Sequence, residues 1–275
     1  LFTEGEGWKP LRIWGMGIAG YDVDLDGFPE YFHTSMADNK LQKLARFKGE
    51  QPKPVYQDIA WARGVTAHRP FMGDDLKPST AWHTQFEDFN NDARADLFIA
   101  KGNVAKMPDF AARDPNNLLL QGFDGKFVEA ADKAGVASGA ISRGGAVADL
   151  NMDGLPDLVV VNRWENAQLW RNATTDAGRF LSVALKQEGP NRDAIGAWIE
   201  VKRGSSIQRR EVFSGGGHAS GQNGWWHFGL GNFAKAQVRV IWPDGTAGDW
   251  QTLQAGLFHV LERGKPPSLW TPRAR

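Results

Sequence analysis

Short runs of alternating apolar and polar residues recur along the chain and end in turns rich in glycine, proline and aspartate. In the N-terminal part, such runs flank acidic segments, as at 82–89 and 97–100. From 179 to 261 the alternation continues without acidic segments, for example at Leu181, Val183 and Leu185. A period of two residues is typical of β-strands, and the helical period is scarce here. The pattern predicts an all-β protein.

An acidic nine-residue loop occurs three times, at 22–30, 88–96 and 149–157. Each copy has Asp or Asn at positions 1, 3 and 5 and an acid at position 9, so a tight coil points several oxygens at one centre. Calcium takes roughly six to eight oxygen ligands in such loops. We therefore expect up to three Ca2+ ions, bound by side chains at positions 1, 3, 5 and 9 and by the main-chain carbonyl at position 7. These residues are Asp22, Asp24, Asp26, Phe28 and Glu30; Asp88, Asn90, Asp92, Arg94 and Asp96; and Asp149, Asn151, Asp153, Leu155 and Asp157.

The loop differs from an EF-hand, which closes with a bidentate Glu at position 12. Position 12 is His33, Ile99 and Val160 in the three copies, and the closing acid stands at position 9. The flanking runs are strand-like, so the loop is expected to join two strands. The alternative is a set of Asp/Asn turns whose side chains only bind their own backbone. The presence of three copies with the same spacing favours metal binding over simple turns.

The three loops are expected to differ in calcium affinity. Gly27 and Gly154 stand at position 6, where a sharp turn favours positive φ, but the middle copy has Ala93 there. Arg94 adds a positive charge to the middle copy, and the first copy has four acids against three in the others. Charge count and rigidity tune such sites. The expected order of affinity is first, third, middle.

Composition excludes several classes of protein. Among 275 residues, 32 are basic and 32 acidic, so the protein lacks the excess of positive charge that would indicate nucleic-acid binding. No apolar run approaches the ~20 residues that span a bilayer. Cysteine is absent, which excludes disulfides and thiol catalysis. The chain starts at Leu1, and we expect sequence upstream of it. Weak calcium loops suit a calcium-rich exterior, which suggests an extracellular or periplasmic location.

The repeat pattern stops near residue 172, which predicts three calcium-loop repeats over 1–172, a small β-sandwich or barrel over 173–265, and a C-terminal tail over 266–275. Within the repeats, segment 56–65 is echoed by 127–136. The loops begin at 22, 88 and 149, spacings longer than the ~40–50 residues of a propeller blade. Insertions are therefore expected at 48–54, 74–78 and 106–115.

The Gly-Phe-Pro-Glu and Gly-Leu-Pro-Asp endings of the first and third loops resemble FG-GAP (VCBS-type) repeats, which form calcium-binding β-propeller blades. The C-terminal part resembles the ASPIC/UnbV domain at 191–197, 214–217, 227–231 and 240–245. Together they resemble the cartilage acidic protein family, which is common in secreted bacterial proteins. Known propellers close with four to eight blades, so three repeats imply a partial or truncated propeller completed by other sequence or by a partner.

No coherent catalytic group emerges from the sequence. His218 lies near Ser214 and Ser220, but no Gly-x-Ser-x-Gly elbow or orienting acid accompanies it. The expected function is a non-enzymatic, calcium-binding interaction or scaffold module. Its expected partners are proteins, an extracellular matrix or a polysaccharide, and a role as one subunit of a larger assembly is compatible with this. The alternative is a carbohydrate-binding or polysaccharide-acting accessory protein that uses exposed aromatic residues. Trp225 and Trp226 are neighbours in a strand, so at most one enters the same core, and domain packing is favoured for them.

Overall fold

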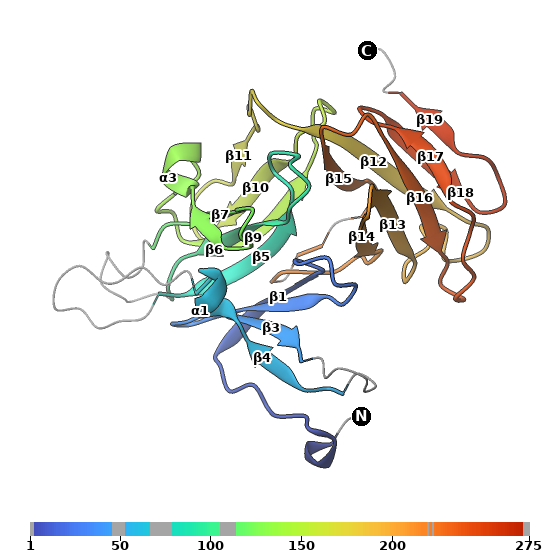
Figure 1. Cartoon of the computed structure of the whole chain (residues 1–275). Helices are drawn as coiled ribbons and strands as arrows, with labels where there is room; N and C mark the ends of the chain where they lie inside the picture. The colour runs from blue at the N-terminus through green and yellow to red at the C-terminus, as the bar shows by residue number, and fades with distance from the viewer. Residues whose placement is uncertain are drawn as a thin grey trace.

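The computed structural model describes residues 3–45, 53–66, 79–104, 114–218, 220–221 and 223–271. The described residues form five β-sheets (Figure 1), which confirms the all-β class expected from the sequence. Strands up to residue 170 form three sheets, and strands from residue 179 onward form two. The expected insertion at 74–78, and most of those at 48–54 and 106–115, lie outside the described residues.

The first two sheets are four-stranded antiparallel blades built to the same plan. In each, a loop of the acidic type joins the first strand to the second. A one-turn helix follows the fourth strand and ends at a glycine with positive φ, which explains the echo between 56–65 and 127–136. The elements are β1 (Gly15–Tyr21), β2 (Glu30–Ser35), β3 (Lys40–Leu44), β4 (Tyr56–Asp58) and α1 (Ala60–Arg63), preceded by a short 3-10 turn (Glu4–Glu6); then β5 (Ala81–Glu87), β6 (Asp96–Lys101), β7 (Asn117–Gln121), β8 (Phe127–Glu129) and α3 (Ala131–Ala134).

The third blade has three described strands, β9 (Ser142–Ala148), β10 (Asp157–Asn162) and β11 (Gln168–Trp170). The blades pack face to face, with β1 against β5 and β5 against β9. β6 is buried on both faces, because Leu97 and Ile99 pack on blade 1 while Phe98 packs towards blade 3. This explains why its sequence is continuously apolar rather than alternating.

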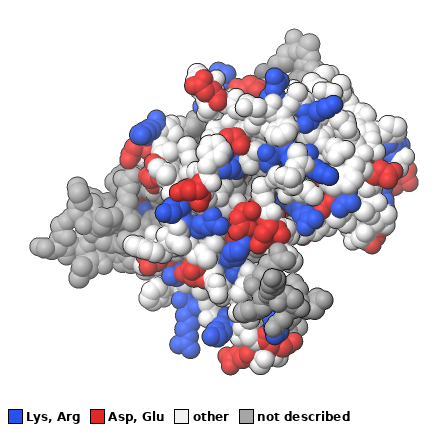
Figure 2. Space-filling model, in the orientation of Figure 1, with Lys and Arg blue, Asp and Glu red and all other residues white. Residues whose placement is uncertain are grey.

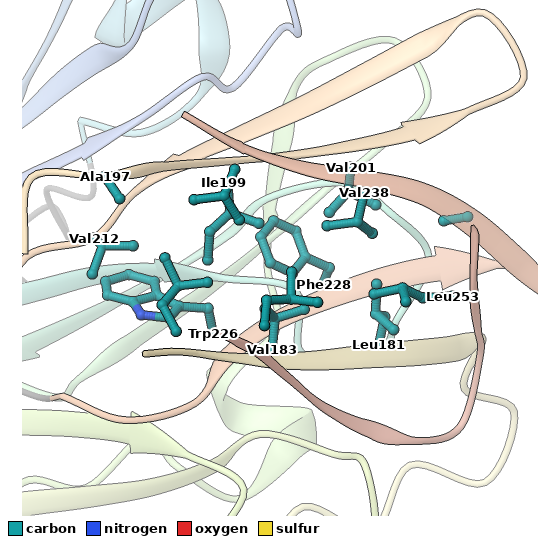
Figure 3. Close-up of a cluster of buried hydrophobic side chains, with 14 of the residues drawn as sticks. Leu181, Val183, Ala197, Ile199, Val201, Val212, Trp226, Phe228, Val238 and Leu253 are labelled. Carbon is teal, nitrogen blue, oxygen red and sulfur yellow. The ribbon is translucent and has the colours of Figure 1, made fainter. Parts of the chain in front are cut away.

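The last two sheets pack on each other as a sandwich. One has the order β15-β12-β18-β19 and the other β14-β13-β16-β17, with β12 and β18 parallel. Figure 3 shows their shared core, in which Leu181 and Val183 of one sheet meet Ile199 and Val238 of the other. The strands are β12 (Arg179–Lys186), β13 (Trp198–Arg203), β14 (Ser206–Glu211), β15 (Trp226–Gly231), β16 (Lys235–Ile241), β17 (Gln251–Gln254), β18 (Phe258–Glu262) and β19 (Ser268–Trp270).

The expected surface tail is only partly correct, because residues 268–270 form β19 on the edge of the sandwich. The cause is aromatic packing: Trp270 contacts Trp225 and Phe258, with ring centroids 5.3 and 5.9 Å apart. Trp226 points the other way into the core. The two tryptophans therefore face opposite sides, as the two-residue period requires, and both pack within their own domain.

Candidate metal loops and the domain joint

The three acidic loops share one backbone conformation. Position 4 and position 6 both have positive φ in every copy. Left-handed backbone is costly for non-glycine residues and persists where surrounding contacts enforce it. The middle loop accepts that cost at Ala93, in place of the glycine of the other copies. The φ values are 59°, 58° and 63° for Leu25, Asn91 and Met152, and 92°, 73° and 87° for Gly27, Ala93 and Gly154.

Side chains of the third loop hold its coil through backbone hydrogen bonds. Asp149 accepts from the N–H groups of Asp153 and Gly154, at 3.1 and 2.8 Å. Asp157 at position 9 accepts from Leu150 N–H at 3.0 Å, and Asn151 accepts from Asp153 N–H at 3.1 Å. These bonds match the Asx-turn alternative, in which the side chains bind their own backbone.

The middle loop repeats this pattern but is buried. Asp88 accepts from Asp92 and Ala93 N–H groups, and Asp96 accepts from Phe89 and Gln121 N–H groups. Asp88 and Asp96 are both 0% exposed. Burial raises the pKa of Asp96 to about 7 and that of Asp88 well above its ordinary value. A bound divalent cation would offset this penalty for the charged forms.

Among the described residues, only the first loop brings three carboxylates close enough together to share one cation. Carboxylate oxygens of Asp22, Asp24 and Glu30 lie within 4.8 Å of one another. One oxygen each of Asp22 and Asp24 is buried without a hydrogen-bond partner. Burial raises the pKa of Asp22 to about 6, with the nearby carboxylates adding to the shift. This cluster has the oxygens for a cation.

The ammonium group of Lys43 already lies in that cluster. Its Nζ is 2.6 Å from Asp24 Oδ2, 2.8 Å from Asp26 Oδ2 and 3.0 Å from Glu30 Oε1. Arg63 adds a contact of 3.3 Å to Asp24. Lys43 and Arg63 lie outside the nine-residue loop, so the charges within the loop alone do not predict them.

Cations also contact the described residues of the other loops, and in the middle loop Arg203 donates to the Ala93 carbonyl at 3.4 Å. Arg94 ion-pairs with Asp92 in the middle loop, and Arg171 lies 3.3 Å from Asp153 in the third. Acidic and basic side chains lie interleaved on the face drawn in Figure 2. Basic side chains therefore partly neutralise the acidic charge of each loop.

The middle loop is also the joint between the blades and the sandwich. Asn91 carbonyl oxygen accepts from Gly231 N–H at 2.8 Å, and the Asn90 carbonyl accepts from Gly178 N–H at 2.9 Å. Asn91 Oδ1 lies 2.6 Å from His227 Nε2, while its Nδ2 donates to the Gly154 carbonyl of the third loop at 2.9 Å. One loop thus touches its neighbouring blade and the C-terminal domain together.

A buried ion pair reinforces this joint. Arg210 of β14 donates to both carboxylate oxygens of Glu87 in β5, at 2.7 and 3.1 Å, and to the His227 carbonyl at 2.7 Å. Both side chains are at most 7% exposed. The pair fixes the approach of the two domains.

The glycine-rich loop after β14 lies along the first strands of the blades. Gly217 pairs with Ile18 through two backbone hydrogen bonds of 3.2 and 3.0 Å. His218 stacks edge-on with Trp82, and Ser220 Oγ donates to the Gly145 carbonyl at 2.5 Å. The hydroxyl and the imidazole are therefore engaged separately. Beside this loop is a cavity of about 270 Å³ between β1, β5 and the sandwich.

Blade 3 exposes an apolar face on the side away from blade 2. Leu158 and Val160 pack towards blade 2. Val161 is 54% exposed on the opposite face, and Leu169, paired with the half-buried Val159, is 65% exposed. The nearby Trp164 is 72% exposed. β10 therefore has apolar side chains on both faces, but only one face is covered within the described residues.

Comparison with known families supports the class of protein that this fold defines. Residues 88–160 match the FG-GAP-like repeat, and residues 187–267 match the ASPIC and UnbV domain. The chain therefore contains an FG-GAP-like repeat followed by an ASPIC/UnbV domain, as the motifs indicated, and domains of these two kinds suggest a protein-interaction module. No curated protein matches the chain. FG-GAP repeat proteins are often extracellular. Within the described residues, no helix has the length and apolar character needed to cross a bilayer.

The second and third loops have the donor types that calcium takes, although among the described residues only the first loop brings three carboxylates within 4.8 Å of one another. Each has three carboxylates and one side-chain amide, on a loop with positive φ at positions 4 and 6. Asp88, Asn90, Asp92, Asp96 and the Arg94 carbonyl would hold the ion in the second; Asp149, Asn151, Asp153, Asp157 and the Leu155 carbonyl would hold it in the third. The ion would supply charge and rigidity. The first loop has Asp22, Asp24, Asp26, Glu30 and the Phe28 carbonyl, but also Lys43 among them.

Proposed function

We propose that this protein is a non-enzymatic, calcium-stabilised interaction module that acts outside the cytoplasm, in the extracellular space or the periplasm. Calcium would stiffen the acidic loops, and through the middle loop it would stabilise the joint to the C-terminal domain. The Glu87–Arg210 pair and the Asn91–His227 contact support this role, because they make the loop part of the domain interface.

The exposed apolar outer face of blade 3 supports the proposal that the protein binds a protein partner. Val159, Val161 and Leu169 form one side of a sheet whose other side packs on blade 2. The same kind of sheet face is covered by a neighbouring blade between blades 1 and 2 and between blades 2 and 3. Contiguous exposed apolar surface is typical of interaction sites. The partner that fits is a second apolar sheet face, from another chain or from further blades.

A photo-activated cross-linker placed at Leu169 tests this face in cells that produce the protein. We expect covalent capture of one defined apolar sheet surface, lost when Val161→Lys is combined with it. The matched control carries the cross-linker at Val128, which is 66% exposed on blade 2. Equal capture from both positions, or none from Leu169, would contradict the proposal.

A second candidate function is carbohydrate binding, which the cavity between β1, β5 and the sandwich favours. Its lining combines the aromatic rings of Tyr31, Trp198 and Phe213 with the charged Arg209 and Glu211. Aromatic faces beside polar groups suit sugar rings. Binding of a glycan that Phe213→Ala abolishes would favour this function, whereas a glycan array without hits would exclude it.

A further inference from the structure

Lys43 donates to three different carboxylates of the first loop. Positions 3, 5 and 9 each contribute one oxygen within 2.6–3.0 Å of Nζ. An ammonium group has three protons, so all of them are used. The oxygens of Asp24, Asp26 and Glu30 that it binds belong to the set that the loop motif assigns to calcium. With Arg63 on Asp24, two positive charges reach the loop, the charge of one calcium ion.

The register of the blades shows why this happens in one copy only. Phe32 pairs with Leu41, Phe98 with Leu118, and Val159 with Leu169, so these leucines are equivalent. Two residues further along the same face stand Lys43, Leu120 and Arg171 in turn. Leu120 is uncharged, so this position contributes no counter-charge to the middle loop. Arg171 has a side chain that is 69% exposed and reaches only the position-5 acid of the third loop.

We propose that Lys43 is a built-in cation of the first loop, which therefore stays free of calcium at concentrations that fill the second and third loops. This inference rests on the proposed calcium role of the loops. The first loop, which has the most acids and was expected to bind calcium most tightly, would then bind it most weakly. The reason is that Lys43, on the strand after β2, supplies the counter-charge. The ammonium group of Lys43 is part of the chain, so its binding to the loop does not depend on any ion concentration. Calcium that enters the first loop must instead displace this group from three carboxylates. The family match at 88–160 covers the second and third loops and begins beyond the first.

Calcium titration by calorimetry of wild-type protein and Lys43→Met tests the inference. Methionine keeps the apolar stem and removes the ammonium charge from Asp24, Asp26 and Glu30, while Arg63 stays on Asp24. We expect two calcium sites in the wild type and a third in Lys43→Met. The calcium affinity of the first loop should rise at least about tenfold over that in the wild type, because a unit positive charge a few ångströms from the ion is removed. In chelator, Lys43→Met should melt below the wild type, and calcium should restore it. The control is Lys40→Met on the same strand, whose Nζ pairs with Asp58 at 3.1 Å.

The outcomes separate this inference from the proposed function. A wild type without any calcium site, together with one site in Lys43→Met, would refute calcium stabilisation and support the inference. Equal site numbers and affinities in both proteins would overturn the inference. Should Lys43→Met not fold, Asp24→Asn combined with Asp26→Asn in the wild type decides: an unchanged count of calcium sites supports the inference, and the loss of one site overturns it.

Discussion

Gly229 in β15 lies directly against the carboxylate of Asp88. A Cβ at this glycine would be 1.7 Å from Asp88 Oδ2 and 2.8 Å from the Cα of Asn91. The glycine of the His-Phe-Gly-Leu-Gly motif is thus required by contact with an acidic loop more than a hundred residues earlier in the chain. Asp88 cannot retreat, because its two oxygens accept N–H groups of Asp92 and Ala93.

Gly229→Ala should therefore destabilise the protein by about 1–3 kcal/mol, the range for inserting a methyl group into a packed site. It should also weaken calcium binding at the middle loop, since Asp88 would be displaced. Urea denaturation and calcium titration measure the two effects. Gly215→Ala is the control, because no atom lies within 4 Å of a Cβ there. Equal denaturation midpoints for both variants would show that the contact is not rigid.

The Glu87–Arg210 pair should be strongly coupled. Removing one partner, as in Glu87→Leu or Arg210→Met, leaves a buried charge alone and should cost about 3–5 kcal/mol. The double variant should lose much less than the sum of the single losses, because neither charge then remains. The exposed pair Arg263–Asp244, at 2.6 Å, is the control, and its loss should change the stability far less than loss of the buried pair, because water screens it. Additive losses at the buried pair would contradict this account.

The sequence was sufficient for features that depend on local pattern. The all-β class, the acidic loops and the opposite directions of Trp225 and Trp226 follow from a two-residue period and from repeated turn chemistry. The positive φ at position 6 was also predictable, and Ala93 adopts it at 73° without glycine. These properties lie within a few neighbouring residues.

Contacts set by tertiary register were not predictable from the loops alone. Lys43 reaches Glu30 across 13 residues through the β2–β3 pairing, and Arg210 reaches Glu87 across 123 residues. One signal was available for Lys43: aligning the repeats at Leu41, Leu118 and Leu169 places Lys43 and Arg171 at one position beside the acids. No comparable repeat signal exists for Arg210, because the second domain has no copy of itself to align.

Chelation should lower the stability of the protein. If a loop binds calcium with a Kd of about 10 μM and calcium is about 1 mM, each filled loop adds ~2.7 kcal/mol. Thermal unfolding with calcium or with excess EDTA measures the difference. Asp153→Asn in the exposed third loop should remove part of the shift and leave the remainder to the middle loop. A melting curve that does not respond to EDTA would exclude structural calcium.

The buried histidines should make stability fall in mild acid. His227 lies between Phe180, with ring centroids 5.8 Å apart, and Asn91, and faces Glu87 and Arg210. Burial lowers the pKa of His227 to about 4, and burial likewise lowers the pKa of His83, which faces Gln85 and His218, to about 4. Below an unfolded pKa near 6.5 the unfolded chain takes up these protons while the folded protein does not, so the stability present above pH ~6.5 is lost as the pH falls towards 4.

The loop carboxylates with raised pKa values, such as Asp96, act in the opposite direction, because folding favours their protonated forms. The measurement is therefore a difference between proteins. Urea unfolding of the wild type and of His227→Gln is followed from pH 8 to pH 4.5, each referenced to its own value at pH 8, where the imidazole is neutral. The wild type should lose up to about 1.4 kcal/mol per pH unit more than His227→Gln below pH ~6, the slope for one proton bound only by the unfolded state. Parallel pH profiles would mean that His227 takes up its proton in the folded protein, at the buried Nδ1, because Nε2 already donates to the Asn91 side-chain oxygen.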